Sequence, residues 1–383
     1  MRLPSVGEQV SVVARTRLAT LIADAARTHF WVARLRDAGL DGTRLRAADA
    51  FAALHALPPV SARELRLAGW GALRDGWARP WWPSSRSSGP AGETFRVYYD
   101  VVAWALLNYA VKLRARMACG VTGDARIAGL EPIPVSREGH SLPELVRPFQ
   151  RISTLQPAAA IAEKLVLHHP SALYGSAPAL LEAGRALDGL GRRLPVRAVF
   201  ITGEVLPAAT RAALAGLFHA PVLDVYGTPE TKEIAWECPF GGRHVNADVL
   251  HVEVLGPDGA VLPTGEEGEI VVSLLVNRAM PLLRYRTGDR GYLLPDRCAC
   301  GCALPLLAVV SGRRALDLDQ GRRVRAIPID FADRRRADFG IRAVRRRVVE
   351  RSLSAGGELA RERLRPFDPL AGSVGIHSDR NLS

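Results

Sequence analysis

Lysine is scarce in this sequence of 383 residues: it occurs only at Lys112, Lys164 and Lys232, against 48 arginines. Five cysteines, most of them clustered, are too few for the disulfide framework of a small secreted protein. No apolar run approaches the ~18 residues of a membrane-spanning helix, and the start of the chain lacks the pattern of a secretory leader. These absences predict a globular cytoplasmic protein without a membrane span.

The positive charge is concentrated in one segment. The formal net charge is +12, and residues 313–365 hold 16 arginines against 8 acidic residues. Such a segment can bind nucleic acid or another anionic partner. However, arginine is used almost everywhere in place of lysine, which favours a compositional bias over a selected patch. Nucleic acid is therefore not a predicted partner.

Apolar periodicity predicts a helical N-terminal region over 1–80 and an alternation of helices and strands after it. Ser61 and Glu64 have the spacing of a capping box, and the Pro-, Ser- and Gly-rich residues 80–100 predict a loop. Alternating strands and helices favour a parallel α/β core. The predicted helices are 5–38, 46–56, 101–117, 158–168, 177–190 and 207–218, and the predicted core strands are 196–202 and 221–226.

After residue 244 the pattern changes to short strands joined by Gly-rich turns. Residues 251–255 and 269–275 predict antiparallel strands of a small β subdomain packed on the core. The predicted fold class is α/β: a layered large N-terminal domain with parallel or mixed sheets, then a short atypical C-terminal segment. The predicted boundaries are 1–312 (helical entry 1–80, α/β core 81–237, β-rich region 238–312) and 313–383.

Polar motifs follow both predicted core strands. Gly203 and Glu204 come directly after the first, and Tyr226, Gly227 and Glu230 lie at the end of the second. Ligands of parallel sheets bind at these carboxyl ends. An aromatic ring there can stack on a base, and a carboxylate can hold Mg²⁺ beside a triphosphate. Taken singly, each motif is more often a plain turn.

Three further segments could complete a nucleotide site. The small-residue loop 84–93 could let backbone N–H groups approach phosphate. Asp289 could accept hydrogen bonds from ribose hydroxyls, and Arg313 could contact phosphate or ribose. A solvent loop, a turn aspartate and a surface arginine are the commoner interpretations of each. The order of all five segments is what predicts a nucleotide site.

Cysteine and histidine gather in two turn-rich segments. Cys238 and His244 form a Cys-x5-His pair, and Cys298 and Cys300 form a Cys-x-Cys pair. Three thiolates and an imidazole suit a closed, structural Zn²⁺ site. Cys302 is a rival ligand, and reduced thiols packed near turns are the alternative interpretation.

The order of these motifs resembles the adenylate-forming superfamily, and within it the branch of phenylacetate–CoA ligases and capsule-biosynthesis adenylate-forming proteins. The resemblance covers roughly residues 45–325. Its segments are the 84–93 loop, ITGEVL at 201–206, VYGTPE at 225–230, the run at 238–259, GEEGEIVV at 265–272, NRAMPLLRYRTGD at 277–289, CACG at 298–301 and GRR at 312–314.

The resemblance implies that ATP converts a carboxylic acid, aromatic or otherwise apolar, to an acyl-adenylate. The thiol of coenzyme A, or another acceptor, then displaces AMP. It implies that Glu230 binds Mg²⁺ and that Asp289 and Arg313 hold the ribose. It further implies pyrophosphate contacts by Ser87, Ser88, Gly89 and Gly92, and adenine contacts by Gly203, Glu204, Tyr226 and Gly227.

The sequence departs from this family at two points. Glu93 stands where a lysine is common, and no lysine follows Lys232, although the family's C-terminal lid carries one. Residues 313–383 are therefore expected to be a truncated or divergent lid. This leaves an alternative function, a nucleotide- or acyl-adenylate-binding homologue without full ligase activity. An amine acceptor, giving an amide, is a third option, and a homodimer is one option for assembly.

Overall fold

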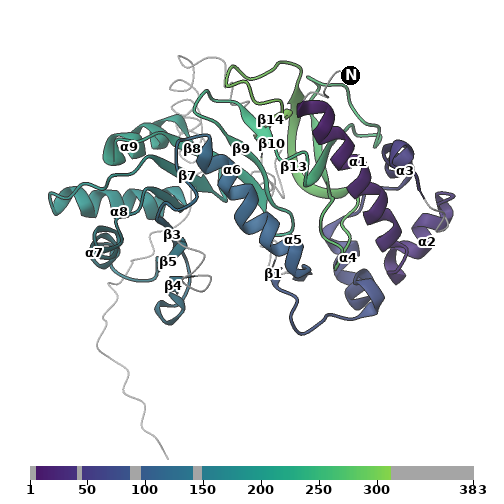
Figure 1. Cartoon of the computed structure of the whole chain (residues 1–383), viewed down its shortest axis with the longest axis horizontal. Helices are drawn as coiled ribbons and strands as arrows, with labels where there is room; N and C mark the ends of the chain where they lie inside the picture. The colour runs from purple at the N-terminus through teal and green to yellow at the C-terminus, as the bar shows by residue number, and fades with distance from the viewer. Residues whose placement is uncertain (1–5, 41–44, 87–95, 141–148, 312–383) are drawn as a thin grey trace, which may run out of the picture. The chain divides into compact units, whose positions relative to one another are not determined.

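The structure, a computed structural model, describes residues 6–40, 45–86, 96–140 and 149–311 (Figure 1). The chain divides into two units, Met1–Pro328 and Ile329–Ser383, and every described residue belongs to the first. The predicted boundary at 312/313 stays a prediction. Among the described helices, none combines the length and apolarity needed to cross a bilayer.

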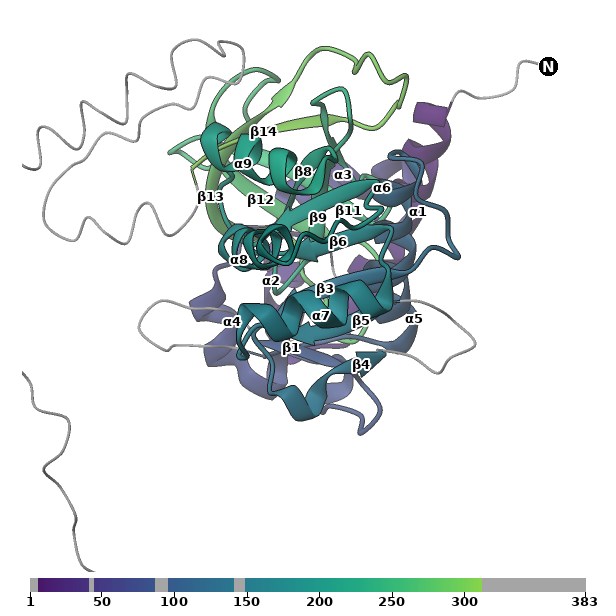
Figure 2. The same cartoon turned by 90° about the vertical axis from the view of Figure 1, so that its left-hand side faces the viewer.

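One sheet of twelve strands runs through the described residues of the chain (Figures 1 and 2). Its strands are β3 (Ile127–Glu131), β4 (Gly139–His140), β5 (Phe149–Ser153), β6 (Ala172–Gly175), β7 (Ala198–Thr202), β8 (Val222–Thr228), β9 (Lys232–Glu237), β10 (Arg243–Val245), β11 (Leu250–Leu255), β12 (Gly268–Leu274), β13 (Tyr285–Leu294) and β14 (Leu306–Ser311). Their spatial order is β11-β12-β13-β14-β10-β9-β8-β7-β6-β3-β5-β4.

The sheet has a parallel and an antiparallel half. Strands β5, β3, β6, β7 and β8 are parallel neighbours, so their carboxyl ends lie along one edge. The direction reverses at the tight turn from β8 to β9, and every later pairing is antiparallel. The parallel half therefore provides the edge where ligands of α/β sheets bind.

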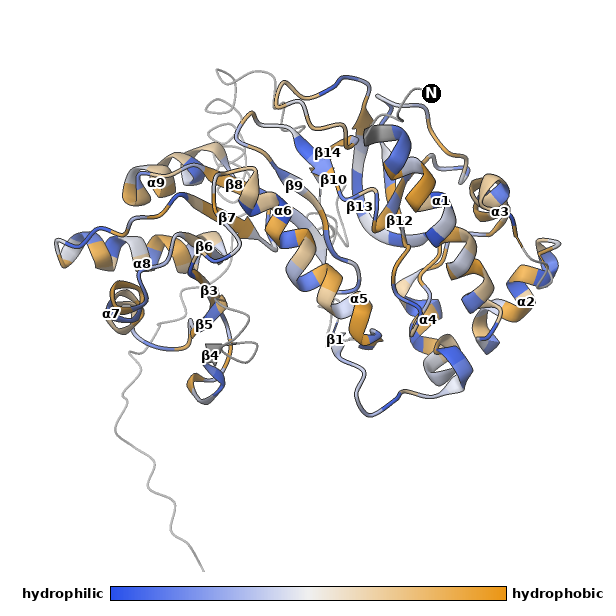
Figure 3. Cartoon of the chain, in the orientation of Figure 1, coloured by the Kyte–Doolittle hydropathy of each residue, from blue (hydrophilic) through white to orange (hydrophobic). Residues whose placement is uncertain are grey.

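Helices cover one face of the parallel half. They are α7 (Ala158–His168), α8 (Ala177–Gly189) and α9 (Ala208–Phe218), which lie on the near side in Figure 2. Figure 3 shows hydrophobic and hydrophilic residues alternating along α8. Leu180, Ala183 and Leu187 form its buried face and pack in one core with Val199 and Ile201 of β7. The helical spacing of these residues is what the sequence predicted.

The opposite face of the parallel half carries a long helix over residues 101–117. It consists of α5 (Val101–Ala105), a π-helical stretch η5 (Leu106–Ala110) and α6 (Val111–Met117). Ala115 of α6 packs in one core with Tyr174 and Phe200 of the sheet. Because side chains of a strand alternate between faces, Tyr174 and Phe200 face α6 while Leu173 and Val199 face α7 to α9.

The N-terminal helices pack on the antiparallel half, in one core with residues of β9 to β14. Trp31 is fully buried, and its indole N–H donates to Pro281 O at 3.0 Å. The helical elements are α1 (Val6–Ala25), α2 (His29–Asp37), η1 (Ala47–Asp49), α3 (Ala50–Ala56), α4 (Ala62–Ala68), η2 (Gly69–Ala72) and η3 (Arg74–Gly76).

The predicted fold class is confirmed, with three differences in detail. The expected helix 5–38 is two helices, because Thr28 accepts a hydrogen bond from Trp31 N and begins α2. The expected loop 80–100 contains an antiparallel pair, β1 (Ser84–Arg86) and β2 (Arg96–Tyr98), and Val97 of β2 is fully buried. The later antiparallel strands continue the main sheet rather than pack on it, because β9 pairs with both β8 and β10.

The predicted capping box at Ser61 is present and gives a stability prediction. Ser61 Oγ accepts from Glu64 N, and Glu64 Oε2 accepts from Ser61 N at 2.8 Å. Ser61→Ala is expected to lower the free energy of unfolding by about 1 kcal/mol, measured by urea denaturation. Ser176 begins α8 without a side-chain cap, so Ser176→Ala is the matched control. An equal loss for both variants would contradict the prediction.

Candidate functional site

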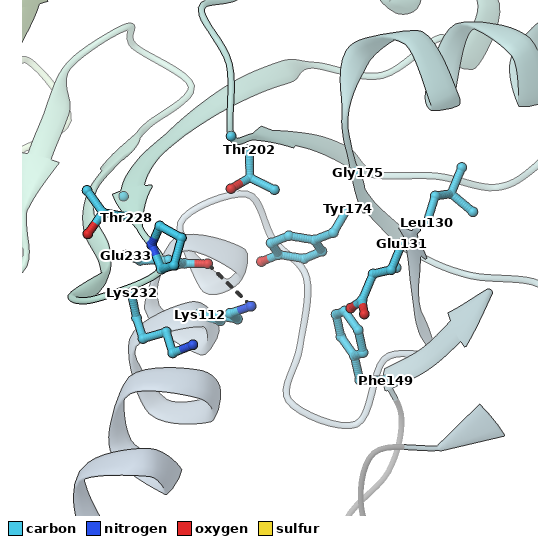
Figure 4. A pocket seen from close by; sticks show the side chains of 14 residues that line it. Lys112, Leu130, Glu131, Phe149, Tyr174, Gly175, Thr202, Thr228, Lys232 and Glu233 are labelled. Atoms are coloured by element: carbon cyan, nitrogen blue, oxygen red, sulfur yellow. Dashed lines mark ion pairs between the residues drawn. The ribbon is translucent and has the colours of Figure 1, made fainter. Parts of the chain in front are cut away.

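A pocket of about 270 Å³ opens at the carboxyl ends of the parallel strands (Figure 4). Thr202 and Gly203 line it at the end of β7, and Gly227, Thr228 and Pro229 line it at the end of β8. Both of the predicted strand-end motifs therefore contribute to one pocket. The remaining lining residues are Lys112, Gly129, Leu130, Glu131, Phe149, Tyr174, Gly175, Lys232 and Glu233.

Aromatic rings form one wall of the pocket. The rings of Phe149 and Tyr174 lie 5.9 Å apart, and Tyr174 stacks on Phe200 at 4.6 Å. Gly129 makes this wall possible, because a Cβ at this position would stand 2.5 Å from Cζ of Phe149. A side chain at 129 would thus displace the Phe149 ring. The Phe149 and Tyr174 rings are tilted by 56° to each other, so the wall is an aromatic corner of the kind that contacts apolar ligands.

Two of the three lysines of the chain line the pocket. The amine of Lys112 lies 3.7 Å from Glu233 and over the rings of Phe149 and Tyr174. The amine of Lys232 lies 4.8 Å from the ring centre of Trp104, a cation–π contact. Burial, together with the charge of Lys112, lowers the pKa of Lys232 to about 8.

Lys232 also has an unusual backbone. Its φ is +62°, a left-handed conformation that costs a non-glycine residue about 1–2 kcal/mol. It stands at the turn from β8 to β9, where a Cβ at Gly227 would lie 2.3 Å from Lys232 O. Only glycine at 227 permits this close approach. The glycine of the Tyr-Gly-Thr-Pro-Glu motif therefore has a structural role as well as a place in the pocket wall.

The other predicted nucleotide contacts lie in two further places. Tyr226 and Asp289 come together from β8 and β13, with the tyrosine hydroxyl donating to Asp289 Oδ2 at 2.8 Å. The carboxylate of Glu204 instead accepts from Ala177 N at the start of α8. Ser87, Ser88, Gly89, Gly92 and Arg313 lie outside the described residues.

Glu230 is fully buried in the described structure. Its side chain is 0% exposed, and Tyr99 donates to its backbone carbonyl at 2.8 Å. Burial and the charge of Glu230 raise the pKa of Tyr99 well above its ordinary value. Glu230 is therefore an interior residue of the described structure, and its predicted contact with Mg²⁺ stays a prediction.

The sequence did not predict the residues that supply the charged and aromatic side chains of the pocket. These are Lys112, Phe149, Tyr174, Lys232 and Glu233. They come from α6, β5, β6 and β9, and no short motif contains them. The scarcity of lysine was the one available signal, because two of the three lysines in the sequence line this pocket.

The four predicted metal ligands form a cluster. The ligand atoms of Cys238, His244, Cys298 and Cys300 all lie within 4.8 Å of one another. Cys238 Sγ is 3.5 Å from Cys298 Sγ, and Cys300 Sγ is 3.2 Å from His244 Nε2. With metal–ligand bonds of about 2.0–2.3 Å, a tetrahedral zinc needs ligand atoms at separations of this order. The cluster therefore fits the ion.

Local turns bring these ligands together. Cys238 N donates to Gly242 O, and Gly241 N donates to Cys238 O, closing a tight turn. A Cβ at Gly242 would lie 2.6 Å from Cys298 Sγ, so glycine gives the second segment room to approach. The rival ligand Cys302 is not a member of the group, but its backbone N–H lies 3.5 Å from Cys300 Sγ.

Comparison with known proteins confirms the resemblance. No family model matches the chain. A stretch of 110 residues, 27% of the chain, is 36% identical to phenylacetate-coenzyme A ligase of Aromatoleum evansii, and 73 residues, 19% of the chain, are 41% identical to that of Thermus thermophilus. These stretches span 24% and 16% of those ligases, so the match covers a quarter of their length or less.

A solved structure resembles the chain over a much longer stretch. It is the open conformation of 2-hydroxyisobutyryl-CoA ligase in complex with 2-HIB-AMP and CoA, with a TM-score of 0.65 at 16% identity. The superposition covers 78% of this chain and 69% of that one. The chain has the adenylate-forming fold. At this identity the likeness shows the fold alone.

Proposed function

We propose that the protein activates a carboxylic acid with ATP, forming an acyl-adenylate and pyrophosphate, and transfers the acyl group to coenzyme A. The observation that carries this proposal is the pocket at the carboxyl edge of the parallel strands. Segments of both strand-end motifs, 202–203 and 227–229, line it beside the aromatic wall. Its matched relatives are named coenzyme A ligases, which supports the choice of acceptor.

Individual roles follow from this placement. The aromatic wall of Phe149 and Tyr174 favours an aromatic acid. Tyr226 and Asp289, joined by their hydrogen bond, are suited to adenine and ribose, because a carboxylate accepts from two hydroxyls. Glu230 is proposed to hold Mg²⁺. The proposed pyrophosphate contacts of the 87–92 loop and the ribose contact of Arg313 lie outside the described residues.

We also propose that Cys238, His244, Cys298 and Cys300 hold a structural Zn²⁺. The four clustered side chains would fill every position of a tetrahedral ion, which is the arrangement of structural rather than catalytic zinc. The ion would hold the segment after β9 against the segment before β14. Reduced thiols of this kind fit a cytoplasmic location.

The proposed activity is tested by acid-dependent exchange of labelled pyrophosphate into ATP, with a panel of aryl and acyl acids. We expect exchange with at least one aromatic acid, and CoA thioester on addition of CoA. Asp289→Asn is expected to lower the exchange rate about 10- to 100-fold, because it weakens a charge-assisted hydrogen bond to ribose. Asp296→Asn, at an exposed aspartate of the same region, is the control and should retain full exchange.

Two other outcomes are informative. If no acid supports exchange, but a non-hydrolysable acyl-adenylate analogue raises the melting temperature, the protein binds adenylates without forming them. If Asp289→Asn and Asp296→Asn behave alike, the ribose role of Asp289 is wrong. Product mass spectrometry with CoA and with amines identifies the acceptor.

A further inference from the structure

Three polar side chains meet at one end of the pocket, which we call the polar end (Figure 4). Lys112 comes from α6, Tyr174 from β6 and Glu233 from β9, and the Lys112 amine lies 3.7 Å from Glu233 Oε1. Tyr174 is only 5% exposed and Glu233 only 7%. In Figure 4 the hydroxyl of Tyr174 and the carboxylate of Glu233 point toward the amine.

Two buried oxygen atoms at the polar end lack a hydrogen-bond partner within the described residues. They are the hydroxyl of Tyr174 and Oε2 of Glu233. Buried polar atoms in folded proteins are nearly always hydrogen-bonded, and leaving them unpaired is costly. Both atoms belong to residues that line the same pocket. Their shared position indicates that a group of the ligand completes their hydrogen bonding.

The chemistry of the polar end restricts what that group can be. The ammonium of Lys112 only donates hydrogen bonds, the Glu233 carboxylate accepts them, and the Tyr174 hydroxyl does both. Burial raises the pKa of Glu233, and the charges of Lys112 and Arg116 oppose that rise. Burial raises the pKa of Tyr174 well above its ordinary value, so its hydroxyl stays protonated. A hydroxyl group of the ligand can accept from Lys112 or Tyr174 and donate to Glu233.

Other substituents fit less well. A second carboxylate at the polar end would place a like charge beside Glu233, whose carboxylate already pairs with the Lys112 amine. A methyl group or a bare ring edge would leave the Tyr174 hydroxyl and Glu233 Oε2 without partners. Beside the polar end, the Phe149 ring offers an apolar surface for the body of the acid. The volume of about 270 Å³ exceeds the ~150 Å³ cavity that accepts benzene.

We propose that the acid activated by this protein is a hydroxyl-substituted aromatic acid, whose hydroxyl is bound by Lys112, Tyr174 and Glu233. These three side chains then determine specificity, while the strand-end motifs hold the nucleotide. This inference rests on the proposed function, because it identifies the pocket as the acid site of the same reaction.

The test compares acids of equal shape on the full chain. The probes are 3- and 4-hydroxyphenylacetate, each paired with the phenylacetate that carries a methyl group in place of the hydroxyl. We expect kcat/KM for pyrophosphate exchange to favour one hydroxy acid over its methyl analogue by at least about 10-fold. Tyr174→Phe and Glu233→Gln should each lower this ratio at least about fivefold. Tyr292→Phe, outside the pocket lining, should leave the ratio unchanged.

The same acid pairs are titrated calorimetrically without ATP, so that a failure of the specificity inference can be distinguished from a failure of the ligase proposal. Exchange that proceeds equally well with hydroxy and methyl acids overturns the specificity inference and leaves the ligase proposal standing. Absence of exchange with every acid overturns the ligase proposal. The specificity inference is then decided by calorimetry: tighter binding of a hydroxy acid, lost in Tyr174→Phe, supports it, and equal or undetectable binding of both acids overturns it. Circular dichroism and melting temperatures verify that the variants are folded.

Discussion

Cys298→Ser is expected to remove bound zinc from the protein and to lower the free energy of unfolding by about 4 kcal/mol. This loss is the stabilisation that a bound ion gives when its free concentration is about a thousand times its Kd. Zinc content is measured by mass spectrometry of the purified protein, and stability by urea denaturation with and without a chelator. The chelator should destabilise the wild type and have little effect on the variant.

The large effect follows from where the cluster lies. Cys238 follows β9, His244 lies in β10, and Cys298 and Cys300 precede β14. Strands β10 and β14 are paired through one residue pair, His244 with Leu306, so few backbone hydrogen bonds hold this junction of the antiparallel half. An ion bound by both segments would hold them together where the hydrogen bonds between the two strands are few. Without it, the two segments would be free to separate.

Two controls make the zinc prediction specific. Cys302→Ser should retain the ion, because Cys302 is not among the four clustered ligands. Gly242→Ala should weaken zinc binding although it removes no ligand, since a Cβ there would lie 2.6 Å from Cys298 Sγ. A wild-type protein that contains no zinc after expression in zinc-supplemented medium would show that the cluster is only a group of reduced thiols.

The elements that could be predicted from the sequence are those with a local signal. The helices near 158–168, 177–190 and 207–218 and the strand near 196–202 were predicted within a few residues, because apolar periodicity reports directly on burial. The four proposed metal ligands were also predicted as a set, and the structure brings their side chains together. Their spacing in the sequence carries enough information, because the two members of each pair, Cys238 with His244 and Cys298 with Cys300, are close together in the sequence.

The pocket walls could not be predicted in the same way. Lys112, Tyr174 and Glu233 are separated by about 60 residues each in sequence and meet only when α6 lies on the assembled sheet. Gly129 has no motif, and its role is visible only from its distance to Phe149. Likewise, the β1–β2 pair was hidden by the turn-forming composition of residues 80–100. In each case tertiary contacts outweigh the local propensity of the sequence.

Arg284→Met is expected to lower the free energy of unfolding by about 3–5 kcal/mol, because it breaks a buried ion pair. Arg284 lies in the Arg-Tyr-Arg-Thr-Gly-Asp segment, where its Nη2 is 3.0 Å from Oε1 of Glu253 on β11. The two side chains are 5% and 2% exposed. The guanidinium also donates to Leu57 O at 2.6 Å, so it joins the end of α3 to the sheet.

The cost arises from the carboxylate that Arg284→Met leaves behind. Burial already raises the pKa of Glu253 although Arg284 lies beside it, and without the guanidinium that pKa rises further. A carboxyl whose pKa is raised in the folded state costs stability above that pKa and none below its unfolded value of ~4.5. The difference between variant and wild type should therefore shrink as the pH falls toward 4.5, measured by urea denaturation at several pH values.

Arg286→Met is the matched control, two residues along the same strand segment. Arg286 pairs with Glu269, but its side chain is 40% exposed, and an exposed ion pair contributes about 0–1 kcal/mol. The double variant Arg284→Met/Glu253→Leu should recover most of the loss, because it removes the buried charge together with its partner. If the double variant is as unstable as Arg284→Met alone, the hydrogen bonds from Arg284 to the end of α3, rather than the buried charge of Glu253, carry the effect. The His55 imidazole, 3.6 Å from Glu253 Oε1, remains beside this carboxylate in Arg284→Met.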